Sequence, residues 1–202
     1  MSLVKNTFIF VLLSLTMIAC GGDSSDSNNG DRLFNQGKFE EAATVYEASL
    51  TNNPRNVKTI YNLGRTYEEL GRNEDAIATY ERVLKEDDKN ANALLSLSNL
   101  NQKLGNNERA LLYAERAVQL PNPSAEAYLF QGRALHQLGN SDDAMEAYTN
   151  AISTNREYAQ AYYYRGALKI AIKKQSSACT DLKKAVALGY ESATPLVEKF
   201  CQ

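Results

Sequence analysis

The stretch "IYNLGRTYEELGRNEDAIATY", residues 60–80, contains most of the information about the fold. Its apolar and small residues recur every three or four positions, which is the spacing of an amphipathic helix, and Gly71 interrupts the pattern. Glycine readily adopts the left-handed backbone conformation that ends a helix. The stretch therefore predicts two helices joined by a tight turn.

The same features recur through the chain with a period of 34 residues. A fixed period of this length indicates an array of stacked helix pairs, each burying the apolar face of its neighbour. We also expect the small residues Gly64, Ser98, Gly132 and Gly166 of the first helices to face the alanines of the second, so that paired helices approach closely. The two periodic series are Gly37, Gly71, Gly105 and Gly139, and Ala42, Ala76, Ala110, Ala144 and Ala178.

The order of Ile60, Leu63-Gly64, Tyr67, Ala76 and Tyr80 resembles the tetratricopeptide repeat motif, with Ile60 in place of the usual tryptophan. This resemblance extends from about residue 28 to 192. It implies an all-α fold, a right-handed superhelical solenoid of about five helix-turn-helix repeats with a C-terminal capping helix. The expected repeats fill residues 31–192 as 31–56, 57–90, 91–124, 125–158 and 159–192, and the capping helix is 193–202.

The N-terminus is typical of an export signal. Lys5 precedes about a dozen mostly apolar residues, too few to cross a membrane, since a spanning helix needs roughly 20. Met17-Ile18-Ala19-Cys20 resembles the lipobox of bacterial lipoproteins, which implies cleavage of residues 1–19 and lipidation of Cys20. An ordinary signal peptide and an uncleaved anchor are the alternatives. Residues 20–30 are rich in glycine, serine, asparagine and aspartate and are expected to form a flexible tether.

Two further cysteines, Cys179 and Cys201, remain if Cys20 is acylated. An even number of cysteines in an exported protein favours a disulfide, and the two helices that carry them should be neighbours. The alternative is a pair of buried reduced thiols. We expect the bond to hold the capping helix in place.

The composition and the motifs exclude several classes of function. The net charge is −2 and lysine and arginine are scattered among acidic residues, so nucleic acid is not an expected partner. The single histidine, His136, has no second histidine or cysteine at metal-ligand spacing, and neither a phosphate-binding loop nor a nucleophile elbow is present. No enzyme activity, metal or cofactor is predicted.

The family resemblance implies a concave groove lined mainly by the first helix of each repeat. Amide, basic and aromatic side chains suit an extended peptide or a partner helix. Of the two-carboxylate clamp found in chaperone-binding relatives, Asn62 alone fits, and Asn92 and Ser96 stand where cations would be. The expected groove residues are Lys58, Tyr61, Asn62, Arg65, Asn92, Leu95, Asn99, Lys103, Leu129, Phe130, Arg133, His136, Tyr163 and Tyr164.

These features together predict a non-enzymatic interaction scaffold or adaptor with a protein or peptide partner, anchored by lipid in the cell envelope. Similar lipoproteins act in outer-membrane, pilus or secretion, and cell-wall assembly. Gly21 after the acylated cysteine favours the outer membrane, facing the periplasm or the cell surface. The alternative function is recognition of a glycan or cell-wall fragment by the tyrosines Tyr128, Tyr162, Tyr163 and Tyr164.

Overall fold

The computed structural model describes residues 23–201, and the side chains from residue 28 onward. This part of the chain is built from helices and turns, which confirms the all-α class. The helices are α1 (Asp23–Asn35), α2 (Phe39–Asn52), α3 (Val57–Glu69), α4 (Asn73–Glu86), α5 (Ala91–Lys103), α6 (Asn107–Val118), α7 (Ala125–Gln137), α8 (Ser141–Thr154), α9 (Ala159–Ala171), α10 (Gln175–Ala187), the short 3-10 helix η1 (Glu191–Ala193) and α11 (Thr194–Phe200).

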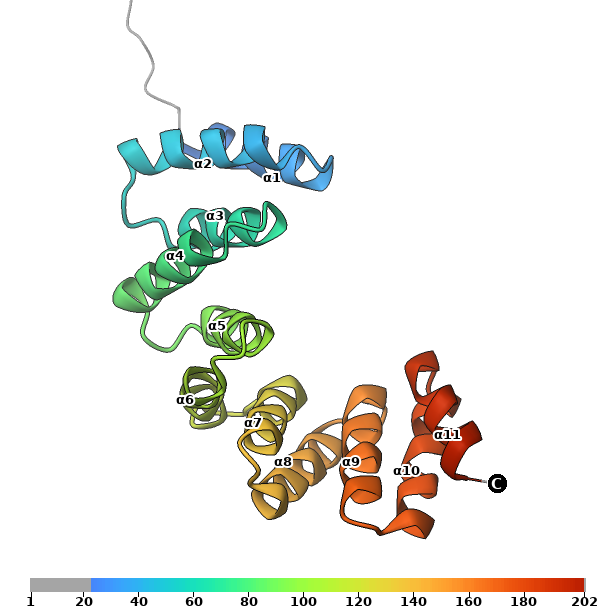
Figure 1. The fold of residues 1–202 in the computed structure, drawn as a ribbon. Helices are drawn as coiled ribbons and strands as arrows, with labels where there is room; N and C mark the ends of the chain where they lie inside the picture. Colours follow the sequence, from blue (N-terminus) through green and yellow to red (C-terminus); the bar gives the residue numbers. More distant parts are fainter. Residues whose placement is uncertain (1–22, 202) are drawn as a thin grey trace, which may run out of the picture.

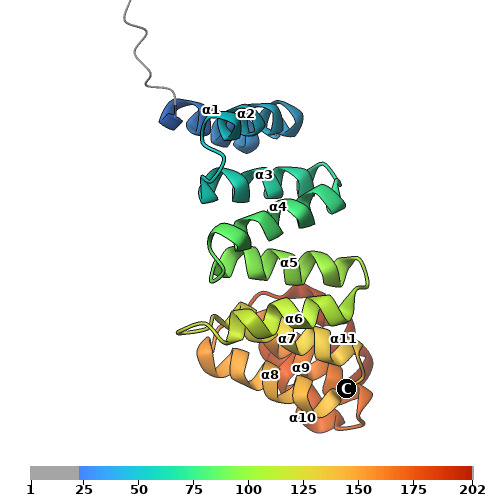
Figure 2. The same ribbon diagram turned by 90° about the vertical axis from the view of Figure 1, so that its left-hand side faces the viewer.

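Consecutive helices pair and the pairs stack into a curved array (Figures 1 and 2). The odd-numbered helices lie on the inner side of the curve in Figure 1, and α1 contacts α3, α5 contacts α7, and α7 contacts α9. The even-numbered helices lie on the outer side. The array therefore presents the first helix of each pair to a concave groove, as the repeat pattern predicts.

Side chains and glycines set the helix ends. The side-chain oxygens of Asn56, Asn90 and Ser124 accept hydrogen bonds from backbone N–H groups of the first turns of α3, α5 and α7. At the other end of α3, Gly71 has a φ of 70° and the chain turns back, so that the N–H of Arg72 bonds to the carbonyl of Tyr67. The second, third and fourth repeats are thereby delimited by local signals in their own sequences.

The fifth repeat makes the same turn without glycine. Lys173 stands at the turn position and has a φ of 61°, and the N–H of Lys174 bonds to the carbonyl of Lys169. A side chain in the left-handed region costs conformational energy that glycine avoids. The turn between α9 and α10 is therefore held by the packing of these two helices.

Close helix pairing depends on small residues, but at two glycines the main contact differs from the expected one. A Cβ atom added at Gly64 would lie 2.7 Å from the Tyr80 ring, and one added at Gly132 would lie 2.6 Å from Tyr148. Gly64 and Gly132 thus face tyrosine rings of the second helices, because a full ring fills the space that a glycine leaves. The predicted contact with the alanine series is present at Ser98, which bonds to the carbonyl of Ala110, and at Gly166, where an added Cβ atom would lie 3.3 Å from the carbonyl oxygen of Ala178. At Gly64 and Gly132 the prediction is corrected, because the nearest atoms belong to tyrosine rings.

The third repeat uses a different pair of residues at this contact. Ser98 takes the place of the glycine and Ala114 that of the tyrosine, and both are buried. The Ser98 hydroxyl donates to the backbone carbonyl of Ala110 over 2.9 Å. A larger residue on one helix is therefore matched by a smaller residue on the other.

The first repeat begins earlier than the sequence analysis expects. Helix α1 starts at Asp23 and includes Gly30, which is buried beneath the ring of Tyr46. The expectation of a flexible tether over residues 20–30 is corrected for the part that lies in α1. Gly30 is one repeat length before Gly64, so it occupies the close-contact position of a complete repeat.

The C-terminal end is closed by the packing of α11 and by a disulfide. Leu196 and Val197 of α11 pack against a small core that contains Leu182, Ala185 and Ala193. A disulfide joins Cys179 in α10 to Cys201, with the Cα atoms 5.4 Å apart. The disulfide thus connects the last repeat to the helix that covers its exposed end.

Candidate partner-binding groove

Two hollows on the inner side of the array lie between first helices. One, of about 290 Å³, lies between α1 and α3. The other, of about 140 Å³, is shared by α3, α5 and α7. Their lining is polar with two aromatic rings in each: Asp31, Phe34, Asn35, Tyr46, Lys58, Asn62 and Arg65 in the first, and Tyr61, Glu68, Asn92, Leu95, Ser96, Asn99, Glu126 and Phe130 in the second.

Most of the expected groove residues are brought together here. Lys58, Asn62 and Arg65 line the first hollow. The second hollow is lined by the expected residues Tyr61, Asn92, Leu95, Asn99 and Phe130, whereas Lys103 of α5 is not part of its lining. Leu129 is a correction: its side chain is 0% exposed and belongs to the core of the fourth repeat. The position is half-exposed in the other repeats, as at Tyr61, so the repeat register alone misplaced it.

The first hollow is organised by Asp31, which sequence reasoning missed. Its carboxylate accepts hydrogen bonds from the Tyr46 hydroxyl (2.7 Å), the Asn62 amide (2.8 Å) and the Lys58 ammonium (2.8 Å). Burial opposes ionisation, but these donors outweigh it and hold the pKa of Asp31 below its usual value. Lys58 and Asn62 are therefore already engaged within the chain, whereas Arg65 stacks over Phe34 with its guanidinium 4.6 Å from the ring centre.

A second carboxylate organises the middle of the groove. Glu68 accepts hydrogen bonds from the Tyr80 hydroxyl (3.0 Å) and from Lys103 (3.0 Å), which links α3 to α5. Tyr61 lies within 3.3 Å of the Ser96 hydroxyl across the same helices. Lys103 is thus an ion-pair partner of the neighbouring repeat as well as a groove residue.

Aromatic rings and one arginine line the groove at the fourth and fifth repeats. The Arg133 guanidinium lies 5.7 Å from the ring centre of Phe130 and 5.0 Å from that of Tyr164. Tyr164 stacks on Tyr148 at 6.1 Å and meets Tyr163 edge-on at 5.1 Å. Phe130 is buried, so it forms the floor of the groove and supports Arg133 rather than projecting from it.

His136 lies on the same helix as Arg133 and is half-buried. Burial lowers the pKa of its imidazole, which favours the neutral form near pH 7. In residues 23–201 no group of three or more histidine, cysteine or acidic side chains is arranged to hold a metal ion.

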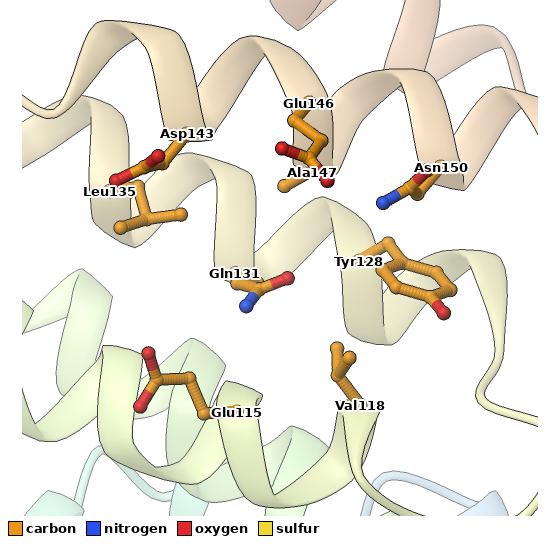
Figure 3. Close-up of a pocket in the computed structure, with 9 residues that line it drawn as sticks. All are labelled: Glu115, Val118, Tyr128, Gln131, Leu135, Asp143, Glu146, Ala147 and Asn150. Atoms are coloured by element: carbon orange, nitrogen blue, oxygen red, sulfur yellow. The ribbon is translucent and has the colours of Figure 1, made fainter.

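A larger hollow, of about 460 Å³, lies elsewhere, between α6, α7 and α8 (Figure 3). Glu115 of α6 and Asp143 and Glu146 of α8 give it an acidic lining, and Gln131 lies between them. Tyr128, one of the four tyrosines considered for glycan recognition, lies in this hollow, whereas Tyr163 and Tyr164 lie together at the groove.

The expected features of the N-terminus, the signal segment 1–19 and Cys20, lie outside the described residues. Among the helices of residues 23–201, none combines the length and the apolar character that crossing a bilayer requires.

Comparison with known proteins identifies the family of this chain. The family model described as tetratricopeptide repeat matches residues 28–91, 61–124, 95–161 and 131–169, which together span more than half of the chain. A search of the curated proteins finds no match.

Solved structures resemble the chain over most of its length. Two crystal structures of MamA are 28% and 29% identical, each with a TM-score of 0.73, and the alignments cover 85% and 82% of this chain and 94% and 96% of MamA. The structure of YrrB, described as a TPR protein with an unusual peptide-binding site, is 22% identical with a TM-score of 0.71 over 88% of this chain and 92% of YrrB. PilF of Pseudomonas aeruginosa is 16% identical with a TM-score of 0.74, covering 83% and 76%.

Proposed function

The chain belongs to the tetratricopeptide repeat family, and from this premise we propose that it is a lipid-anchored scaffold that binds a protein or peptide in its concave groove. The single observation that carries the proposal is the groove itself, where polar side chains and aromatic rings together line hollows over at least three repeats. Proteins of this repeat family are generally scaffolds that bind other proteins rather than enzymes. The peptide-binding site named for the similarly folded YrrB also supports this mode of binding.

We propose that the scaffold acts in the bacterial cell envelope, at the outer membrane, with Cys20 as the lipidated residue. The support comes from the sequence: the apolar segment before Cys20, the lipobox-like Met17-Ile18-Ala19-Cys20 and the cysteine pair near the C-terminus. Acyl chains on one cysteine would hold the groove at the membrane surface, where it could gather components of an envelope assembly.

The groove can be tested with a double variant, Arg65→Ala and Arg133→Ala. Both guanidiniums lie at the groove and stack on rings, so their loss should remove binding anchors without opening the core. Crosslinking in cells followed by co-purification should recover at least tenfold less of the partner that the wild-type chain captures.

A matched control removes two cations from second helices, Lys85→Ala and Arg109→Ala, which are exposed on α4 and α6. This control should capture the partner as the wild type does, and both variants should keep the wild-type helical content by circular dichroism. Undiminished capture by the groove variant would reject the groove as the interface.

The anchor is tested by Cys20→Ala. Without the acylated thiol the chain should move from the membrane fraction to the soluble fraction of lysed cells, with an unchanged thermal unfolding midpoint. Incorporation of radiolabelled palmitate into the wild type alone would support the same conclusion. A variant that stayed in the membrane fraction would indicate an uncleaved leader.

A further inference from the structure

One tyrosine position has the same environment in the first two repeats. The Tyr46 hydroxyl donates to Asp31, and the Tyr80 hydroxyl donates to Glu68. Each carboxylate also accepts a hydrogen bond from a lysine of the following repeat, Lys58 in the case of Asp31. In both repeats a buried tyrosine ring thus extends to the groove, where its hydroxyl and a lysine both donate hydrogen bonds to one carboxylate.

The fourth repeat has the tyrosine but lacks the carboxylate, and the cation near it is Arg133 of its own first helix instead of a lysine of the following repeat. Tyr148 packs on Gly132 as Tyr46 and Tyr80 pack on their glycines, and its side chain is 0% exposed. Its hydroxyl has no hydrogen-bond partner among residues 28–201. The repeat register explains why, because Arg133 stands where the first repeat has its aspartate and His136 stands where the second has its glutamate.

The cation next to this hydroxyl is equally without an anion. Arg133 is half-buried between the rings of Phe130 and Tyr164, and in the part of the chain described it makes no ion pair with a carboxylate. Ring stacking occupies the faces of a guanidinium and leaves its N–H donors at the edge. A buried donor without an acceptor costs free energy, and an arginine fork fits a carboxylate in two hydrogen bonds.

We propose that an acidic side chain of a bound peptide supplies the missing carboxylate, pairing with the Arg133 guanidinium and accepting from the Tyr148 hydroxyl. This inference rests on the proposed function, since it assigns one subsite of the groove. It requires an aspartate or glutamate in the partner at the level of the fourth repeat. It differs from the two-carboxylate clamp, since the positions Asn62, Asn92 and Ser96 lie in the second and third repeats.

The Tyr148 hydroxyl is reached by moving side chains rather than backbone. Tyr164 stacks on the Tyr148 ring, and Arg133 packs against Tyr164. Tyr164 and Arg133 are both half-buried at the groove. A carboxylate that pairs with Arg133 would shift the side chains of Arg133 and Tyr164 aside. It could then accept the hydrogen bond of the Tyr148 hydroxyl.

The first test measures carboxylate binding with synthetic peptides and the full chain in detergent micelles. The probes are acetyl-Ala-Ala-Glu-Ala-Ala-amide, its glutamine isostere, and the glutamine peptide with an unblocked C-terminal carboxyl group. The readout is the Nε–Hε resonance of Arg133 in 15N NMR, assigned by its absence in Arg133→Gln. The glutamate peptide should shift this resonance with at least tenfold higher affinity than the glutamine peptide.

Equal responses to glutamate and glutamine would overturn the proposal, and stronger binding of the peptide with only a terminal carboxylate would overturn its assignment to a side chain. Because no cellular partner enters the titration, its result is separate from the co-purification test of the groove. Glutamate-selective binding together with undiminished capture by the Arg65 and Arg133 variant would reject the proposed function alone.

The second test compares two hydroxyl deletions, Tyr148→Phe and Tyr46→Phe. Tyr46→Phe loses a hydrogen bond to Asp31 and should lower the thermal unfolding midpoint by about 2–4 °C. Tyr148→Phe removes a hydroxyl without a partner and should not lower the midpoint. Tyr148→Phe should weaken the glutamate peptide about threefold to tenfold, and Tyr46→Phe should leave its affinity unchanged. Equal thermal losses in both variants, or unchanged affinity in Tyr148→Phe, would contradict the assignment.

Discussion

Replacing Asp181 with alanine is expected to reduce the free energy of unfolding by about 3–5 kcal/mol. The side chain of Asp181 in α10 is 5% exposed, and its two carboxylate oxygens accept hydrogen bonds from the Arg165 guanidinium at 2.8 Å each. Lys169 donates to the same carboxylate at 2.7 Å. The variant leaves two cations of α9, each with only 17% of its side chain exposed, without their anion.

Urea unfolding followed by circular dichroism measures this loss, and Asp142→Ala is its control. Asp142 is an exposed residue of the first turn of α8, so its replacement should cost less than about 1 kcal/mol. Because repeats contact only their neighbours, the Asp181 variant should lose the fifth repeat before the rest unfolds. A loss no larger than that of the control would show that the ion cluster contributes little to stability.

Removing the disulfide with the pair Cys179→Ala and Cys201→Ala is expected to cost about 3 kcal/mol, as the chain-entropy account gives for a closed loop of this size. The two residues are 22 positions apart and enclose η1 and α11. Helix α11 has seven residues, none of them fully buried, and a helix this short does not persist alone in water. The loss should therefore be local to the capping helix.

Hydrogen exchange read by mass spectrometry gives the location of the effect. Amides of residues 191–201 should exchange at least tenfold faster in the variant, and wild type treated with reductant should behave in the same way. Amides of α3 and α4 are the internal reference and should not change. Thiol titration of unreduced wild type should find neither Cys179 nor Cys201 reactive. Unchanged exchange over residues 191–201 would mean that packing alone holds the cap.

The repeats were predictable because each signal is local. The turn glycine, the small residue of the first helix and the alanine of the second recur at one period, and each acts within its own helix pair. Helix α1 was missed because its sequence, DSSDSNNGDRLFN, has the composition of a linker and few apolar residues. The position of Gly30, one period before Gly64, was the available signal.

The groove was only partly predictable because its side chains are arranged by contacts between helices. The repeat register predicted which faces of the helices form the groove, but it placed Leu129 at the surface. The neighbouring helices bury this side chain instead. The hydroxyls of Tyr46 and Tyr80 reach carboxylates because each ring lies across the glycine of a first helix. Sequence spacing does not report such contacts between one helix and the next.

The matched residues at the helix contact also determine where this array can be cut and rejoined. The pairs Gly64–Tyr80 and Ser98–Ala114 fill the same space between two paired helices in different ways. Combining the first helix of one repeat with the second helix of the other would either overfill this space or leave a void. Either error costs on the order of 1–5 kcal/mol, which is a large fraction of the roughly 5–15 kcal/mol that stabilises a whole domain. Chimeric arrays made from these repeats should therefore be joined between repeats, at the segments before Val57 or Ala91, and never at the turn inside a repeat.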